Sequence, residues 1–413
     1  MLIKEKRVEL IELFYDLIYV YAISRLTMLI EEPEGGLISL SGFFRYLVVC
    51  LVILQAWLYL TNYINRYGSW KWYEYGFTVV NMTAAVYMAN TISPKWNEMS
   101  VTFNLSMLVM LLCVAGMYLI QAVVKVLDTG AARNSLTILF AGCLLYAAAF
   151  FASLLHAGHL IIWLDVAAVL VGAFLPFFIR GNFSADIISF PHLAERFELI
   201  TIITFGEGIV GVTEFFDVKS FSMQPILVFL VILLLFGCYI LQIHYLCDHH
   251  RVDRALRLMF SHYVIVIALN LITIAFKFLK NPSANRLFTA GLMTAAMVLF
   301  FGAIYSDSAY YSVQFQFKRI DFIYTAVFLS MGCILMLLLR NNIYGFLTGA
   351  LVAAGGSRNS QTIPGALWVY RTCSITGYRG RFGRDCLCMR YPWYFGHEGR
   401  YKHGWHLPWK SAF

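Results

Sequence analysis

Charged residues are scarce in this sequence. Asp, Glu, Lys and Arg make up 13% of the 413 residues, whereas an ordinary soluble domain carries about 25%. Hydrophobic residues account for 60% and aromatic residues for 16%. This composition excludes a soluble globular protein. It is typical of an all-α, polytopic membrane protein, because lipid forces each backbone polar group to be satisfied within its own helix.

The motifs of several enzyme and pump classes are also missing. The sequence contains no phosphate-binding G-x-x-x-x-G-K-[ST], no nucleophile motif G-x-S-x-G and no zinc-protease motif H-E-x-x-H. No lysine lies in the middle of an apolar run, which argues against a Schiff-base chromophore, and no segment is long enough for the nucleotide domain of an ATP-driven pump. We therefore favour a non-enzymatic role and assign no cofactor.

Apolar runs between charged residues predict the membrane helices. A helix needs about 20 mainly apolar residues to cross the hydrocarbon core. Seven uncharged runs qualify directly: residues 46–65, 75–94, 99–124, 220–247, 258–276, 287–306 and 322–339. The run 134–179 is too long for one helix and is split at His156–His159, and the spans 11–30 and 193–216 contain charges. The total is eleven spans, and the short run 343–354 is a truncated twelfth.

The C-terminal residues 355–413 differ from the rest. They carry nine basic and two acidic residues, while the preceding part is nearly neutral. The segment lacks a nucleic-acid-binding motif, so we exclude nucleic acid as a partner. Its Gly, Arg, Tyr, Trp and Pro content is what a disordered or non-native end of a reading frame would have, and the alternative is a tail lying on anionic lipid headgroups.

Cysteine and histidine do not form a recognisable metal motif. The nine cysteines are scattered and odd in number, so we predict packing residues rather than a disulfide framework. Cys386 and Cys388 with the histidines of the tail lack zinc-site spacing. The loop Asp248–Asp253 could bind a metal, but a polar loop explains it equally well. We assign no metal site.

Lysine and arginine in the short loops predict the orientation. With the N-terminus inside, the inner loops hold twice as many of these residues as the outer loops. The first span is not a cleaved signal peptide, because Glu12 and Asp16 interrupt it. We expect a multi-pass membrane protein with a cytoplasmic N-terminus.

Ionisable residues inside spans are the best functional candidates, because a charge at a helix centre costs about 2.5–3.5 kcal/mol on insertion scales. In the first span, Glu9, Glu12 and Asp16 stack on one face. Arg25 lies nine residues beyond Asp16, about 180° around the helix, so it needs a counter-ion on another helix.

The seventh span is the second charged helix. His192, Glu195 and Glu198 recur every three residues, and Glu207 lies deeper between two glycines, which suggests close packing or a local break. Arg196 shares a face with Glu207 but is about 16 Å away along the helix.

The simplest hypothesis pairs these two helices. Glu12 or Asp16 would meet Arg196, and Glu207 would meet Arg25. The alternative is that these are buried ion pairs that only fix helix register. Asp165 is a third intramembrane carboxylate and is equally ambiguous, while we expect His156 and His159 to be solvated loop residues.

The two charged helices lie six spans apart and share a short pattern. Each places Glu two residues before Phe, as Glu12–Phe14 and Glu195–Phe197. This predicts two parallel six-helix halves, residues 1–180 and 181–354, in which the first and seventh spans are equivalent.

The same segments resemble the bacterial low temperature requirement protein A (LtrA) family. The segment Glu12–Ile23 is similar to that family's E-L-F-x-D-L-x-x-V-x-A-I start, and His192–Leu199 with Gly206–Glu207 is similar to its H-x-x-E-R-x-x-L followed by G-E. The resemblance covers residues 1–354 and implies a multi-pass inner-membrane protein associated with growth at low temperature. It singles out, as positions that match the two motifs, Glu12, Asp16, His192, Glu195, Arg196 and Glu207.

From these residues we expect a proton- or cation-linked transporter or permeation protein. Asp16 and Glu207 would bind the proton or cation, Arg25 and Arg196 would be their counter-ions, and His192 would be a proton relay. The expected partners are membrane lipids and an unidentified small ion or solute. The competing hypothesis is a membrane sensor or lipid-active enzyme linked to low-temperature growth. The sequence indicates neither the direction of transport nor an oligomeric state.

Overall fold

A computed structural model of the chain describes residues 6–124, 129–178, 187–216, 222–249, 251, 253–312 and 318–356, and these form helices joined by loops, without a β-strand. These helices belong to one compact unit, Met1–Thr362. The tail from residue 357 lies outside the described residues. The first six helices are α1 Leu10–Thr27, α2 Leu40–Tyr67, α3 Trp72–Thr91, α4 Trp96–Val124, α5 Thr129–Leu154 and α6 Gly158–Phe178. The next six are α7 Phe190–Gly211, α8 Gln224–Ile240, α9 Leu256–Lys280, α10 Arg286–Ser306, α11 Arg319–Leu338 and α12 Ile343–Gly355.

Polar residues at the helix starts fix where several helices begin. Ser39 accepts from Gly42 N (3.3 Å), Asn285 from Leu287 N (2.9 Å), and Asn342 from Tyr344 N (3.0 Å). These side chains satisfy backbone N–H groups that have no partner in the first turn. Helices α7 and α8 carry a proline in their first turn, where its missing N–H costs nothing.

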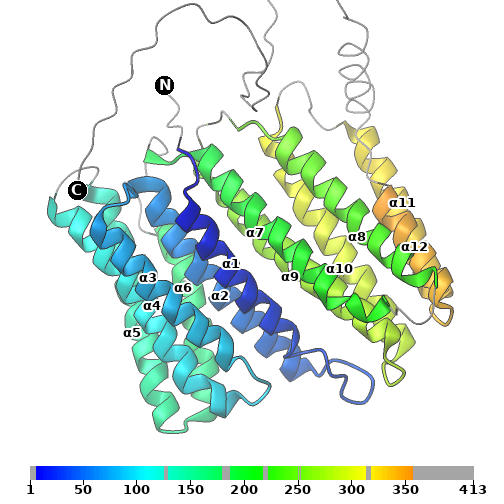
Figure 1. The fold of residues 1–413 in the computed structure, drawn as a ribbon, viewed down its shortest axis with the longest axis horizontal. Coiled ribbons are helices and arrows are strands. Elements are labelled where there is room, and N and C mark those ends of the chain that lie inside the picture. The colour runs from blue at the N-terminus through cyan, green and yellow to red at the C-terminus, as the bar shows by residue number, and fades with distance from the viewer. Residues whose placement is uncertain are drawn as a thin grey trace, which may run out of the picture. The chain divides into compact units, whose positions relative to one another are not determined.

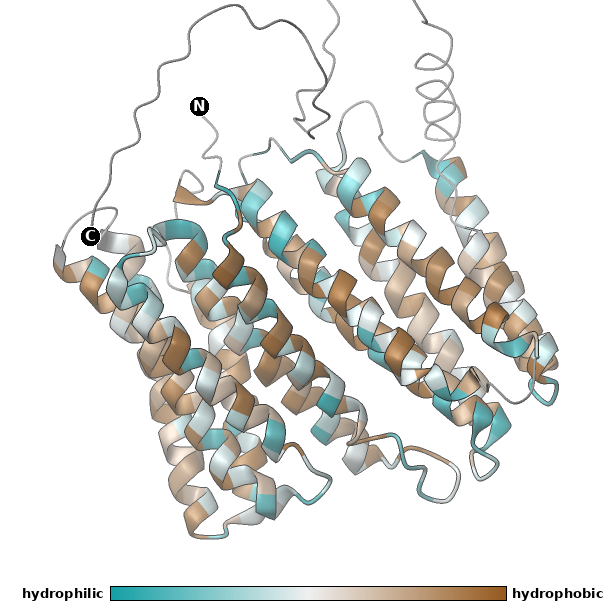
Figure 2. Ribbon diagram, in the orientation of Figure 1, coloured by the Kyte–Doolittle hydropathy of each residue, from teal (hydrophilic) through white to brown (hydrophobic). Residues whose placement is uncertain are grey.

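Eight of the described helices are long and apolar enough to cross a membrane: α2, α4, α5, α6, α8, α9, α10 and α11. Their outward faces expose large apolar side chains, including Phe140, Phe151 and Leu338, which are 63%, 62% and 71% exposed. Figure 2 shows the same pattern as apolar colour along the helices and polar colour concentrated at the ends and loops. Apolar surface of this extent indicates a membrane protein.

Helices α1 and α7 bury charged residues and expose apolar ones, which is the reverse of a surface helix in a soluble protein. On α1 the buried face carries Glu12 and Asp16, while Leu10, Phe14 and Leu17 are 82%, 58% and 52% exposed. On α7 the buried face carries His192 and Arg196. This is the arrangement expected when lipid is the surrounding solvent, because charged groups then face the bundle interior.

Helices α1 and α7 lie side by side and run in the same direction through the middle of the bundle (Figure 1). Helix α1 also packs on α2 and α3, and α7 on α8 and α9. Helix α2 reaches across to contact both α7 and α9. The charged faces of α1 and α7 therefore meet beside α2.

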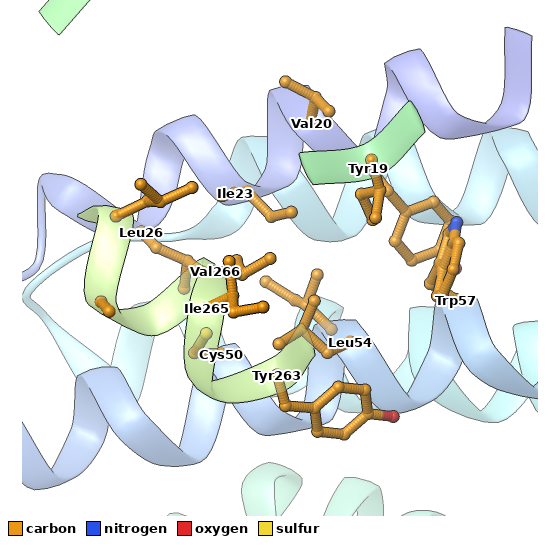
Figure 3. Packing of buried hydrophobic residues seen from close by; sticks show 14 of the residues in the cluster. Tyr19, Val20, Ile23, Leu26, Cys50, Leu54, Trp57, Tyr263, Ile265 and Val266 are labelled. Carbon is orange, nitrogen blue, oxygen red and sulfur yellow. The ribbon is translucent and has the colours of Figure 1, made fainter. Parts of the chain in front are cut away.

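An apolar core fills the space between α1, α2 and α9 (Figure 3). Tyr19, Ile23 and Leu26 of α1 are fully buried there against residues such as Cys50 of α2 and Ile265 of α9. These α1 residues follow Asp16 along the helix, so the core packs the bundle on the C-terminal side of the charged residues. The six cysteines within the described residues are free, and five of them are buried.

Candidate functional site

Four ionisable side chains from α1 and α7 form a cluster in the interior of the bundle. Glu12 and Asp16 come from α1, and His192 and Arg196 come from α7; all four have no exposed surface. Each pair is four residues apart, so its members lie one above the other on a single helix face. We call these four residues the central cluster.

Arg196 holds both carboxylates at once. Its Nη1 donates to Glu12 Oε2 at 2.5 Å, and its Nη2 donates to Asp16 Oδ1 at 2.6 Å. One helical turn separates the carboxylates, and the planar fork of the guanidinium spans that separation. The guanidinium carbon also lies 5.9 Å from the ring centre of Tyr15 and 5.6 Å from that of Trp57. Charged hydrogen bonds and two aromatic faces thus replace the water that Arg196 loses on burial.

Helix α2 supplies three polar side chains to the cluster. Trp57 Nε1 donates to Asp16 Oδ1 at 2.7 Å, and Arg196 Nη2 donates to Thr61 Oγ1 at 3.4 Å. The third side chain, Asn65, contacts the imidazole ring of His192. These residues were not among the candidates predicted from the sequence, although their spacing of four residues places them on one face of a helix.

Asn65 determines the protonation state of His192. The Asn65 amide oxygen accepts from Ser189 N at 3.1 Å, and its nitrogen donates to Ser189 O at 2.8 Å, so the orientation of the amide is fixed. The same nitrogen donates to His192 Nδ1 at 3.0 Å. The imidazole proton therefore lies on Nε2, which donates to Glu12 Oε2 at 3.0 Å. His192 is a neutral donor to Glu12, and a role as proton relay would require Asn65 to turn away.

The cluster contains one more acid than base. Glu12 and Asp16 bring two carboxylates, Arg196 brings one permanent positive charge, and His192 is neutral in the described tautomer. Asp16 Oδ2 and Arg196 Nε are buried without a hydrogen-bond partner in the described structure. A net negative charge buried between helices is costly, so one additional proton or one monovalent cation would stabilise these four residues.

The structure brings together only some of the residues predicted from the sequence. Glu12 or Asp16 was expected to meet Arg196, and both do. Glu195 is exposed, and Glu207 and Arg25 are half-buried. The expected pair between Arg25 and Glu207 does not form among the described residues, and Arg25 Nε has no hydrogen-bond partner there.

The rotation of α1 explains why that pair is absent. Arg25 lies about 180° around the helix from Asp16, and Asp16 faces α7. Arg25 is therefore turned away from α7, although it lies at a depth similar to that of Glu207. The glycines beside Glu207 differ from each other: a Cβ on Gly208 would lie 3.2 Å from Thr273 Oγ1 of α9, whereas Gly206 faces open space. Of these two glycines, Gly208 is the one that packs closely against α9.

The remaining candidates lie apart from the central cluster. Asp165 of α6 is fully buried, and neither of its carboxylate oxygens has a hydrogen-bond partner among the described residues. His156 and His159 are exposed at the turn between α5 and α6. The cysteine and histidine group of the tail lies outside the described residues.

Comparison with known proteins agrees with the motifs on α1 and α7. No protein of curated function matches the sequence. The family model for the bacterial low temperature requirement A protein (LtrA) matches residues 7–355, which include all twelve described helices and the whole central cluster. The chain therefore belongs to the LtrA family.

Proposed function

We propose that this protein is a proton- or cation-linked transporter or permeation protein of the bacterial inner membrane, and that the central cluster is its ion-binding site. In this proposal all twelve helices belong to the membrane body, with α12 as a short last span, and the N-terminus is cytoplasmic. The observation that carries it is the excess of one buried carboxylate over permanent cations at a helix–helix interface.

The packing of the helices supports a division into two equivalent halves, α1–α6 and α7–α12. Helix α1 packs on α2 and α3 in the same way as α7 packs on α8 and α9. The pairs α3–α4, α5–α6 and α2–α6 have the counterparts α9–α10, α11–α12 and α8–α12. Substrate and ion sites of many transporters lie between such repeats, and α1 and α7 are equivalent helices of the two halves.

The burial of the cluster corresponds to a closed state in this proposal. All four residues are sealed from solvent, and the apolar core of Tyr19, Ile23 and Leu26 follows them along α1. Exchange of the bound ion would require α1 and α7 to separate or slide. A proton or cation bound at the cluster neutralises its extra negative charge and removes the repulsion between Glu12 and Asp16. Ion binding therefore favours the closed arrangement.

We assign the residues distinct roles. Asp16 binds the proton or cation, since its Oδ2 has no protein donor in the described structure. Arg196 is the counter-ion that keeps both carboxylates in place, and His192 positions Glu12 through its Nε2 proton. Glu207 and Arg25, which lie further along α7 and α1, are proposed as a second carboxylate and a separate cation on the outer half of the pathway.

The test is ion flux into proteoliposomes. Purified protein is reconstituted with an internal pH dye, and proton movement is driven by an imposed pH gradient or by inward gradients of Na⁺ or K⁺. We expect flux in wild type and loss of flux in Asp16→Asn, which keeps the size of the side chain and removes its charge. The matched control is Glu98→Gln, which alters an exposed carboxylate paired only with Lys95. Equal flux in wild type and Asp16→Asn would refute the assigned site.

A cavity favours a second candidate function, the binding of a membrane amphiphile by a sensor. A space of about 330 Å³ lies beside a different face of α2 from the one that carries Trp57, Thr61 and Asn65. Its wall is mainly apolar, with residues such as Leu58 and Met259, and also includes Arg66 and Arg254. This volume is at the lower end of known ligand pockets, and two guanidinium groups beside apolar walls suit an anionic headgroup with an acyl chain.

The two candidates give different results in one experiment. If the protein is a lipid sensor, purified protein should be stabilised against heat by anionic phospholipid more than by zwitterionic phospholipid, and Arg254→Gln should reduce that difference. The same preparation should then show no ion flux above that of empty liposomes. Ion flux abolished by Asp16→Asn and unaffected by Arg254→Gln would favour transport.

A further inference from the structure

A second group of ionisable residues lies on the other side of α7 from Arg196. Glu198 of α7, His244 and His249 place their ligand atoms within 4.8 Å of one another. His244 Nδ1 lies 2.9 Å from Glu198 Oε2, and His249 Nε2 lies 3.9 Å from Glu198 Oε1. Glu198 follows Arg196 by two residues, so it points away from the central cluster.

Glu198 is the residue that points to a ligand. Only 10% of its side chain is exposed, and its Oε1 has no hydrogen-bond partner in the described structure. That oxygen faces His249. The distance of 3.9 Å between Glu198 Oε1 and His249 Nε2 is too long for a hydrogen bond. An atom bound between them would use the free lone pair of this buried carboxylate oxygen.

The backbone around the histidines is built to hold them in place. His244 lies in a π-helical turn, Leu241–Tyr245, that ends α8, and such turns are frequent at functional sites. The segment that follows is hydrogen-bonded to the segment after α10: Asp248 N donates to Tyr310 O at 2.8 Å, and Ser312 N donates to Leu246 O at 2.9 Å. This attachment directs His249 back toward α7, so residues from three separate segments converge.

We propose that Glu198, His244 and His249 form a binding site for a divalent transition-metal ion, with Zn²⁺ as the best fit. Two imidazoles and one carboxylate are a ligand set that zinc uses, with a fourth position open to water. Ligand atoms around tetrahedral zinc are about 3.4 Å apart at bond lengths of about 2.0–2.2 Å. The present separations need only small side-chain rotations, in which His249 Nε2 exchanges its 3.1 Å hydrogen bond to His244 O for the metal.

A metal at this position would join α7 to the end of α8 and to the loop that follows α8. All three ligands lie in the second half, on the side of the bundle where α7 begins. The metal would therefore fix the end of α7 that carries His192 and Arg196. We infer a structural or regulatory zinc site near the proposed cytoplasmic surface, in addition to the proposed ion site.

Zinc binding to the full chain tests this proposal. Purified protein is treated with chelator, and Zn²⁺ is titrated in competition with a chromophoric indicator, with thermal unfolding as a second readout. We expect one zinc ion per chain and a raised unfolding temperature. His249→Ala and Glu198→Gln should weaken this binding at least about tenfold, since removal of a direct ligand costs no less than loss of an outer-shell partner.

Two control variants exclude other sources of binding. His159→Ala removes an exposed histidine outside the group, and the triple variant Cys373→Ser, Cys386→Ser and Cys388→Ser removes all three thiols of the tail. Both should bind zinc as wild type does. Absence of stoichiometric zinc, or unchanged affinity in His249→Ala, would overturn the proposal, as would loss of binding in the cysteine variant. If His249→Ala unfolds, the visible spectrum of Co²⁺-loaded wild type reports whether nitrogen and oxygen ligands are present or sulfur.

Discussion

Replacement of Arg196 by methionine should be among the most destabilising single changes in this protein. The substitution removes two charged hydrogen bonds, to Glu12 and Asp16, each worth about 1.5–3 kcal/mol. It also removes the cation from between the rings of Tyr15 and Trp57. Two carboxylates are then buried together without a counter-ion, and proton uptake by one of them limits the cost. We expect a loss of about 3–5 kcal/mol in the free energy of unfolding.

The assay is equilibrium unfolding in mixed micelles, followed by tryptophan fluorescence. The matched control is Arg25→Met, because Arg25 is an arginine of the same helix as Glu12 and Asp16 and forms no ion pair among the described residues. We expect a loss of less than about 1 kcal/mol for that variant. Addition of Glu12→Gln and Asp16→Asn to Arg196→Met should restore about 2 kcal/mol or more, because the partners left behind are then uncharged.

Two results would refute this reasoning. If Arg196→Met and Arg25→Met cost the same free energy, the hydrogen bonds of Arg196 do not stabilise the bundle. If the triple variant is less stable than Arg196→Met alone, buried negative charge does not cause the loss of stability. The lost packing of the arginine's aliphatic stem must then be the cause.

Further predictions concern the surroundings of the cluster and Asp165. Trp57→Phe removes the donor to Asp16 Oδ1 and should lower stability by about 1–3 kcal/mol, measured by the same unfolding assay; no change would mean that the hydrogen bond is replaced or unimportant. Asn65→Leu removes the donor to His192 Nδ1 while Nε2 still donates to Glu12, so the Nδ1 chemical shift should change because that nitrogen loses its hydrogen bond and becomes free to accept a proton; an unchanged NMR spectrum would contradict the assigned tautomer. Asp165→Leu removes a buried carboxylate without a described partner and should raise the unfolding temperature; a fall would indicate a partner. Gly211→Val should be destabilising, since even a Cβ there would lie 2.6 Å from Thr273 Cγ2, and Gly206→Val should be tolerated.

The sequence was sufficient to predict the helices and part of the cluster. Each of the seven uncharged runs overlaps one described helix, because lipid demands long, uncharged helical segments, and eight of the described helices are long and apolar enough to cross a membrane. The contact of Glu12 and Asp16 with Arg196 followed from the cost of burying single charges. The sequence predicts that Arg25 lies about 180° around the helix from Asp16. Which of these two sides faces α7 depends on the packing, and because Asp16 faces α7, Arg25 does not pair with Glu207 among the described residues.

Other features depended on tertiary structure. Trp57, Thr61 and Asn65 carry no formal charge, so no search for ionisable residues could reveal them. The group of Glu198, His244 and His249 depends on a π-helical turn and on a loop hydrogen-bonded to the segment after α10, neither of which has a sequence period. Exposure of Glu195, three residues from Glu198, is likewise decided by which helix packs on that face of α7.

The infrared spectrum of the buried carboxyl groups most directly tests whether the central cluster holds an exchangeable proton or cation. Wild type, Asp16→Asn and Glu98→Gln are compared in buffer free of small monovalent cations, before and after a rise in pH or the addition of Na⁺. We predict a protonated-carboxyl band in wild type and Glu98→Gln that disappears on either treatment and is missing in Asp16→Asn. Identical difference spectra for wild type and Asp16→Asn would contradict the account.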